Sequence, residues 1–346
     1  MFFSYIFLPT ITAIFLSLSL TAFIRFLALR LKVLSRLGSR HAGLHAKPML
    51  GGAAIFLTFV LITVFYPGLV ITKIIAAIIA ATLLLIVVGI VDDIKPLSWQ
   101  TQLYAQLAAC FVIVASGVRL FYINNPFGGV LKLDQWQVNF PGVDSIPILG
   151  TIFIVIWLLV FANAFNWLDG IDGLASGVGS IAFIILALLS LTASVFQPPV
   201  AILSSILAGA TLGFFIWNFP KAKIYLGGSS IAIGFILGAM SVFAGAKVAT
   251  TFLVFAIPLI DVLWVIAGRF MRRKSIFVGD ATHLHHRLLK RGWSEKKILV
   301  FLLVITSVAG VLSIIFAGIA KFIIILLFIL GTVLSFLFID KNLKSV

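Results

Sequence analysis

The sequence predicts an all-α polytopic membrane protein with about ten or eleven transmembrane helices. Of its 346 residues, 62% are apolar and only 10% are charged, whereas a soluble domain carries about a quarter charged residues. Apolar runs long enough to span a hydrocarbon core of about 30 Å follow one another from Phe2 to Phe338. Because these runs are continuous, they indicate helices and exclude the short alternating strands of an outer-membrane barrel.

The expected spans leave no room for a separate soluble domain, so we expect a single multi-pass membrane domain over residues 1–346. One connecting segment, 119–146, is longer than the others, and its alternation around Val130 and Trp136 predicts a short hairpin. The spans are expected at 2–24, 49–66, 73–91, 102–118, 147–162, 174–195, 200–217, 230–245, 249–267, 298–319 and 321–338.

Positive charge is distributed unevenly between the two faces that these spans define. In the first segment the charges follow the apolar run, which is typical of a retained anchor with its N-terminus outside. The positive-inside rule then makes the richer face cytoplasmic, together with the C-terminus. The net charge of +15 is therefore mainly a topology signal and does not indicate nucleic-acid binding, although the same charges can contact membrane lipids. Of the 25 Lys and Arg residues, 20 fall in 25–48, 92–101, 163–173, 218–229, 268–297 and 339–346.

Six of the ten acidic residues fall at or beside cytoplasmic span ends, where carboxylates are costly and tend to mark function. Asp92 and Asp93 follow an apolar run directly, and two adjacent carboxylates repel each other unless a cation or a proton lies between them. Mg²⁺ would relieve that repulsion, because it prefers oxygen ligands and is held by few carboxylates together with substrate phosphates. Asp261 and Asp280 also lie on this face.

The segment 163–173 carries a polar side chain at every third position: Asn163, Asn166, Asp169 and Asp172. Any helical turn would align such residues on one face. Gly170 and Gly173 allow the backbone to turn and to approach a ligand closely. An ordinary helix exit with capping residues is the alternative interpretation, but a cap does not need four spaced polar side chains.

Two basic loops complete the polar face. Lys47 precedes Pro48 and the Gly51-Gly52 pair, which we expect to admit phosphate oxygens. A second loop contains His283, His285, His286 and Arg287. Zinc is one interpretation of this histidine cluster, but no cysteine completes such a site, so an anion clamp is favoured.

In this order and spacing, the segments resemble the polyprenyl-phosphate N-acetylhexosamine-1-phosphate transferases, which form glycosyltransferase family 4. The family's aspartate pair is similar to Asp92-Asp93, and its Asn-x-x-Asn-x-x-Asp-Gly-x-Asp-Gly motif matches 163–173 without a substitution. Its His-x-His-His loop resembles 283–286, and its first cytoplasmic motif resembles Lys47-Pro48. The wording His-Leu-His-His-Arg-Leu is closer to the branch that uses UDP-GlcNAc-like donors than to the branch that makes the peptidoglycan lipid intermediate.

The resemblance implies transfer of a sugar 1-phosphate from a UDP-N-acetylhexosamine to polyprenyl phosphate, such as undecaprenyl phosphate, with release of UMP. It implies a multi-pass protein of the inner (plasma) membrane with a cytoplasmic active face. The implied cofactor is Mg²⁺, with Mn²⁺ as the alternative, and a homodimer is one implied assembly. The glycan served stays open between O-antigen, teichoic acid and another surface glycan. The implied catalytic residues are Asp92, Asp93 and Asp169, the metal ligands Asp93, Asp169 and Asp172, and the substrate-binding residues Lys47, Asn163, Asn166, His283, His285, His286 and Arg287.

Two departures from the family pattern affect these expectations. Gln102 stands where the family usually has a basic residue, and Gly228 stands where it has an aspartate that binds Mg²⁺. A catalytically impaired relative that binds lipid phosphate or partner proteins is therefore the second hypothesis, and Gly228→Asp would be expected to raise activity. A transporter is the third, although its polar residues would lie in mid-span.

Overall fold

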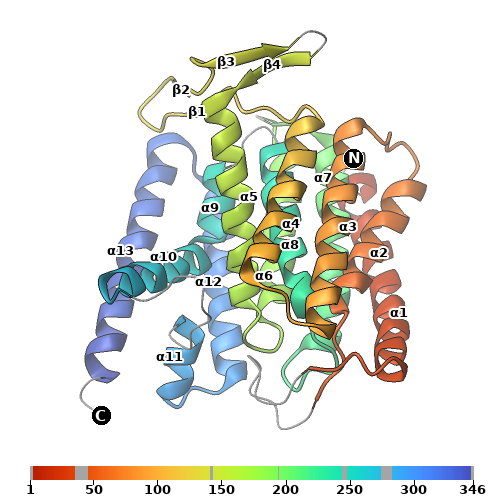
Figure 1. Cartoon of the computed structure of the whole chain (residues 1–346). Helices are drawn as coiled ribbons and strands as arrows, with labels where there is room; N and C mark the ends of the chain where they lie inside the picture. The colour runs from red at the N-terminus through yellow and green to blue at the C-terminus, as the bar shows by residue number, and fades with distance from the viewer. Residues whose placement is uncertain are drawn as a thin grey trace.

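The protein is described here by a computed structural model that covers residues 3–35, 46–140, 143–193, 195–243, 248–273 and 283–343. Helices account for most of these residues and run side by side as one bundle (Figure 1). In chain order they are η1 (Phe3–Phe7), α1 (Leu8–Arg30), α2 (Gly51–Phe65), α3 (Lys73–Ile94), α4 (Trp99–Ala115), α5 (Ile148–Leu168), α6 (Leu174–Ser190), α7 (Pro198–Asn218), η2 (Gly227–Ser229), α8 (Ser230–Phe243), α9 (Val248–Val254), α10 (Ala256–Met271), α11 (Leu284–Lys290), α12 (Glu295–Ile315) and α13 (Gly318–Leu343).

The lengths of these helices confirm an all-α polytopic membrane protein. Among the described residues, six helical segments are long and apolar enough to cross a membrane: η1 with α1, α3, α5, α7, α12 and α13. The α9–α10 pair passes the same criterion as a bent unit, and α2, α6 and η2 with α8 are shorter apolar helices. Several helices begin at a hydroxyl cap, since Thr72, Ser98 and Ser294 each accept a backbone N–H from three residues further on.

Helix α7 lies at the centre of the bundle and α13 at its edge. In their most apolar stretches, 78% of α7 is buried inside the protein, against 11% of α13. Helix α7 packs against α1, α2 and α6. The Ser17 hydroxyl of α1 donates to the Ala210 carbonyl of α7 at 2.7 Å, which satisfies a polar group away from water.

The span expected at 249–267 is bent, because α9 and α10 meet at an angle of 78°. Pro258 explains the break: it lacks an N–H, and its ring would clash with the carbonyl of Val254, the last residue of α9. Helix α10 consequently runs across the bundle towards α13 (Figure 1).

The segment 119–146 forms two antiparallel hairpins where one was expected. Strand β1 (Tyr122–Asn124) pairs with β2 (Val130–Lys132), and β3 (Gln137–Phe140) pairs with β4 (Val143–Pro147). Gly128 and Gly129 have φ values of +109° and +73°, which allow the tight turn between β1 and β2. Both hairpins lie at the end of the bundle opposite α11 (Figure 1).

Candidate active site

The predicted motifs converge at the end of the bundle that carries α11, and direct contacts join them there. Helices α3 and α5 are longer than expected, so the Asp pair and both Asn residues lie on helices and not on loops. Parts of the expected loops 25–48 and 268–297, including Asp280, lie outside the described residues.

The adjacent carboxylates Asp92 and Asp93 lie in the last turn of α3 and bond to different partners. Asp92 Oδ1 accepts from the Leu97 N–H at 2.7 Å and from Gln102 Nε2 at 3.1 Å. Asp93 Oδ1 accepts from the Gly228 N–H at 2.8 Å. Gln102, which stands where the resemblance implies a basic residue, is therefore a neutral donor to Asp92. The Asp92–Asp93 pair links α4 to η2.

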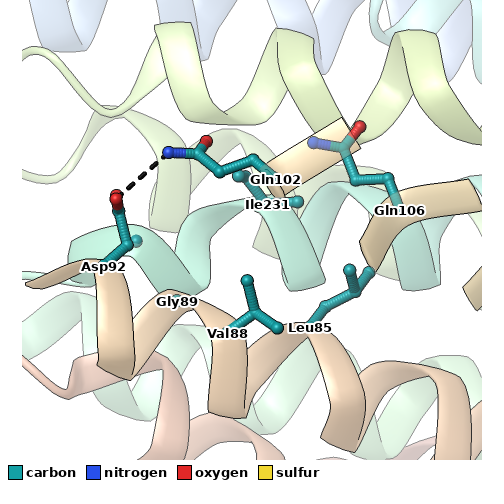
Figure 2. Close-up of a pocket in the computed structure, with 8 residues that line it drawn as sticks. Leu85, Val88, Gly89, Asp92, Gln102, Gln106 and Ile231 are labelled. Atoms are coloured by element: carbon teal, nitrogen blue, oxygen red, sulfur yellow. Dashed lines mark hydrogen bonds between the residues drawn. The ribbon is translucent and has the colours of Figure 1, made fainter. Parts of the chain in front are cut away.

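Asp92 and Gln102 face a small pocket between α3, α4 and α8 (Figure 2). Deeper in this region, Asn163 Nδ2 donates to Gln106 Oε1 and to the Leu159 carbonyl, both at 2.8 Å. The Asn163 amide thus joins α5 to α4, so the structure gives it a bridging contact in addition to its predicted place in the motif. The pocket is lined by Leu85, Val88, Gly89, Asp92, Gln102, Gln106, Gly228 and Ile231.

The rest of the Asn-Asp motif follows the end of α5. The Asn166 Oδ1 accepts a hydrogen bond from the Ser230 hydroxyl at 3.3 Å, and buried Asp169 is the C-cap of the helix. Asp172 Oδ2 accepts from the Ala222 N–H at 2.8 Å and lies 3.4 Å from Lys47 Nζ. Capping is therefore part of what the segment does, but three of its side chains also reach other parts of the chain.

Lys47 lies between the Asp172 carboxylate and the Tyr225 ring, whose centroid is 4.9 Å from Nζ. Burial acts to lower the pKa of Lys47, but its hydrogen bond with Tyr225 and the charge of Asp172 outweigh burial and raise that pKa above 10.5. The ammonium is therefore charged at neutral pH. For the Tyr225 hydroxyl, burial acts in the other direction and raises the pKa, so this hydroxyl stays protonated at neutral pH.

The expectation that Gly51 and Gly52 admit phosphate oxygens is wrong. Their N–H groups donate to the carbonyls of Tyr225 and Leu226, at 2.9 and 3.4 Å. A β-carbon on Gly51 would lie 2.3 Å from the Phe214 ring, and one on Gly52 would lie 2.3 Å from Ser229 Cβ. These glycines let the N-terminus of α2 pack against the 225–229 turn, and that packing occupies the helix N–H groups.

The histidine motif forms α11, which lies against the turn after α5. A β-carbon on Gly170 would come within 2.4 Å of His285 Nε2, so the absence of a side chain at Gly170 makes room for this imidazole. The His285 ring lies 4.2 Å from the His286 ring and 6.0 Å from the His283 ring, centroid to centroid. His283 and Arg287 bond to the buried Asp261 of α10, which sequence analysis placed on this face without giving it a role.

Asn218, the last residue of α7, is a residue of this region for which the sequence predicted no role. Its Oδ1 accepts from the Gly173 N–H at 3.1 Å and from the Ser176 hydroxyl at 2.9 Å, and its Nδ2 donates to the Ile224 carbonyl at 3.0 Å. The side chain is 1% exposed. Asn218 holds the Asp169–Gly173 turn against the 219–226 loop, and a lone polar residue at the end of an apolar span was the available signal.

Position 228 has no room for the aspartate side chain that the resemblance implies there. A β-carbon on Gly228 would lie 2.6 Å from the Gly89 carbonyl oxygen and 3.0 Å from Gly89 Cα. The reciprocal β-carbon on Gly89 would lie 2.6 Å from the Gly228 carbonyl carbon. Helix α3 and η2 therefore meet backbone to backbone, and this packing argues against the gain expected from Gly228→Asp.

Comparison with known proteins shows the family to which the chain belongs. A sequence profile of glycosyl transferase family 4 matches residues 75–245. The decaprenyl-phosphate N-acetylglucosaminephosphotransferase of Mycolicibacterium smegmatis is 32% identical over 340 residues, which cover 88% of this chain and 81% of that protein. The chain belongs to glycosyl transferase family 4.

Two further relatives align over similar lengths. The probable undecaprenyl-phosphate N-acetylglucosaminyl 1-phosphate transferase of Bacillus subtilis is 27% identical over 81% of this chain and 76% of its own length. The phospho-N-acetylmuramoyl-pentapeptide-transferase of Leuconostoc mesenteroides is 26% identical over 82% of this chain and 89% of its own length. The family profile includes Asp92, Asp93 and the 163–173 motif, whereas Lys47 and α11 lie outside the matched range.

Proposed function

We propose that this chain transfers N-acetylhexosamine 1-phosphate from a UDP-sugar to polyprenyl phosphate and releases UMP. In this reaction an oxygen of the lipid phosphate attacks the sugar-bearing phosphorus of the donor. The bond from that phosphorus to the bridging oxygen of UMP breaks, so the products are polyprenyl-diphosphoryl sugar and UMP. UDP-GlcNAc is the proposed donor, because the names of two of the compared relatives specify N-acetylglucosamine and the His-Leu-His-His wording favours the same branch.

The observation that supports this proposal best is the meeting of carboxylates and cationic or imidazole groups on one short turn. Between Asp169 and Asp172, Gly170 lies against His285 Nε2, and Asp172 contacts Lys47. Donor, acceptor and product all carry phosphate, so a site for them must neutralise negative charge and fix phosphate positions. Residues 125 positions apart, Lys47 and Asp172, are brought together at that turn.

The two carboxylates at the end of α3 suit different tasks. Asp92 lines the pocket between α3 and α4, so we assign it to orient the acceptor phosphate. Asp93 is held by the η2 backbone, whose next residues reach Asn166, and we assign it with Asp169 to the donor diphosphate. Lys47, His285 and His286 would bind phosphate oxygens, while His283 and Arg287, both bonded to Asp261, would support that surface.

The carboxylates of Asp93, Asp169 and Asp172 are the hard oxygen donors that Mg²⁺ prefers, and Mn²⁺ would accept the same set. Among the described residues, no three such side chains lie close enough to hold a metal by themselves. Mg²⁺ usually takes one or two protein carboxylates and completes its shell with substrate phosphates and water, so it would need only part of this set together with the donor diphosphate. When bound, the cation would neutralise charge on the diphosphate.

The proposed location is the inner (plasma) membrane with the α11 end of the bundle in the cytoplasm. The loops at that end carry most of the Lys and Arg residues, as the positive-inside rule requires. A UDP-sugar is a cytoplasmic metabolite and a polyprenyl tail lies in lipid, so a site at a cytoplasmic span end can meet both.

Gly228 stands where the resemblance implies a Mg²⁺-binding aspartate, so we also consider a second function. In that case the chain binds these substrates without transferring the sugar phosphate. The test is incubation of the purified full chain with undecaprenyl phosphate, Mg²⁺ and a panel of UDP-sugars, with UMP release and labelled lipid product as readouts. Mg²⁺-dependent UMP release that requires the lipid supports the transferase. Binding of undecaprenyl phosphate and a UDP-sugar without UMP release would support the impaired relative, and absence of both would overturn the proposal.

A further inference from the structure

We infer that Asp261 is a positioning residue: it fixes α11 on the turn after α5 and thereby sets the position of His285. The inference concerns a residue of the bent α10 helix that has no place in the motifs discussed above. It deepens the proposed function and rests on that function for its effect on catalysis. The positioning itself rests only on contacts within this chain.

Helix α11 needs an external support because it is short and lacks its own cap. It spans Leu284–Lys290, seven residues, and its N-cap residue His283 makes no side-chain capping bond. An isolated helix of this length is unstable in water, since nucleation costs more than so few hydrogen bonds return. Contacts with the rest of the protein must therefore hold the histidine motif in place.

Asp261 supplies three such contacts from a different helix. Its Oδ1 accepts the Leu284 N–H at 2.8 Å, which caps the start of α11, and accepts Arg287 Nη2 at 3.2 Å. Its Oδ2 lies 2.9 Å from His283 Nδ1. One carboxylate thus binds the residue before the helix, the first residue of the helix and the residue one turn later.

The three contacts are buried, so water does not compete for them. Asp261 is 7% exposed, His283 7% and Arg287 5%. The Arg287 guanidinium also lies over the Phe336 ring of α13, 4.3 Å from its centroid, which closes the far side of the cluster. A buried charged hydrogen bond of this kind is strong, and removal of one partner leaves the other charge unpaired.

The contacts of Asp261 with His283, Leu284 and Arg287 lie beside His285, the imidazole that we assign to phosphate binding. The His283 ring stacks with the Trp167 ring of α5 and with the His285 ring, at centroid distances of 5.7 and 6.0 Å. Asp261 and His285 line the same pocket between α5, α6, α10 and α12. A shift of α11 would therefore move His285 away from Gly170, while Asp169 and Asp172 stayed on α5 and its turn.

The experiment compares the full-length wild type with Asp261→Asn in the same detergent by hydrogen–deuterium exchange and steady-state kinetics. Asparagine keeps the shape and one acceptor oxygen but loses the negative charge. Exchange of the amides in 283–290 is expected to rise while exchange in α5 to α8 stays unchanged. The kcat is expected to fall by about a hundredfold, with a smaller change in the KM for undecaprenyl phosphate, because misplacement of a positioned group by about 1 Å has that effect.

Two further variants make the result specific. Ser241→Ala removes the buried hydroxyl that accepts a hydrogen bond from Trp157 Nε1 inside the bundle, and it is expected to leave both exchange in 283–290 and kcat unchanged. Asp261→Asn combined with Arg287→Met removes the unpaired charge as well, so it should fold even if Asp261→Asn does not, and α11 should still exchange rapidly.

The outcomes separate this inference from the proposed function. If the wild type releases no UMP, the proposed function fails, and exchange in 283–290 still decides whether Asp261 positions α11. Unchanged exchange in 283–290 would overturn the inference whatever the activity. Faster exchange spread equally over α5 to α8 would also overturn it, because Asp261 would then be a general stabilising residue.

Discussion

Any side chain at Gly228 is expected to force α3 and η2 apart. A β-carbon there would lie 2.6 Å from the Gly89 carbonyl oxygen, whereas comfortable carbon–oxygen contacts begin at about 3.3 Å. The turn would have to move by about 0.7 Å, and such overpacking costs about 1–3 kcal/mol. The same movement would stretch the hydrogen bond from the Gly228 N–H to Asp93. Gly228→Asp should therefore lower both stability and UMP release.

The assay compares thermal unfolding and Mg²⁺-dependent UMP release for Gly228→Asp, Gly228→Ala and Gly89→Ala. Gly268→Ala is the matched control, because Gly268 lies on α10 with nothing within 4 Å of its β-carbon position. Alanine at Gly268 should be neutral, or stabilise by up to about 1 kcal/mol through helix propensity. A rise in UMP release with Gly228→Asp, together with a lower Mg²⁺ requirement, would refute this reasoning and restore position 228 as a metal ligand.

Three other predictions concern the site and its orientation. Asp169→Asn and Asp172→Asn are expected to cut UMP release by orders of magnitude in folded protein as judged by gel filtration, whereas near-normal rates would leave only a capping role. Lys47→Met should weaken UDP-sugar binding by the same factor from about pH 7 to about pH 10, and the difference should shrink only as the pH rises through the raised pKa of Lys47, above 10.5. A membrane-impermeant thiol reagent should label Gln135→Cys but not Ser294→Cys in intact cells, and the reverse pattern would invert the topology.

Local patterns in the sequence predict most of the helices, because a span is determined by a continuous run of apolar residues. The α9–α10 bend was missed although Pro258 lies inside the expected span. Proline within an apolar run is tolerated in many membrane helices, so Pro258 alone does not predict a bend. The bend depends on tertiary packing, in which α10 contacts α13. Alternation predicted strands near Val130 and directly after Trp136, where β2 and β3 lie, but it did not predict which strands pair.

The helical placement of candidate site residues was predictable where spacing carries the signal, whereas contacts with partners distant in sequence were not. Polar side chains recur at every third position of the 163–173 motif, so a helical conformation could be predicted for its first part. Asp261 contacts residues 22 to 26 positions away, and Asn218 bonds to Gly173, 45 positions away. The misinterpretation of Gly51 and Gly52 has the same origin, since their neighbours Phe214 and Ser229 come from the second half of the chain.

The long sequence separations within the site have a consequence for how the protein is made. Lys47 meets Asp172 across 125 positions, and Asp93 meets Gly228 across 135. Chains are synthesised and inserted from the N-terminus, so each of these contacts waits for a later helix. Helix α11 emerges after α10, and only then can His285 reach Gly170. A nascent chain released before residue 283 would therefore hold every aspartate that we assign to the site, but it would lack His285, the imidazole that lies against Gly170.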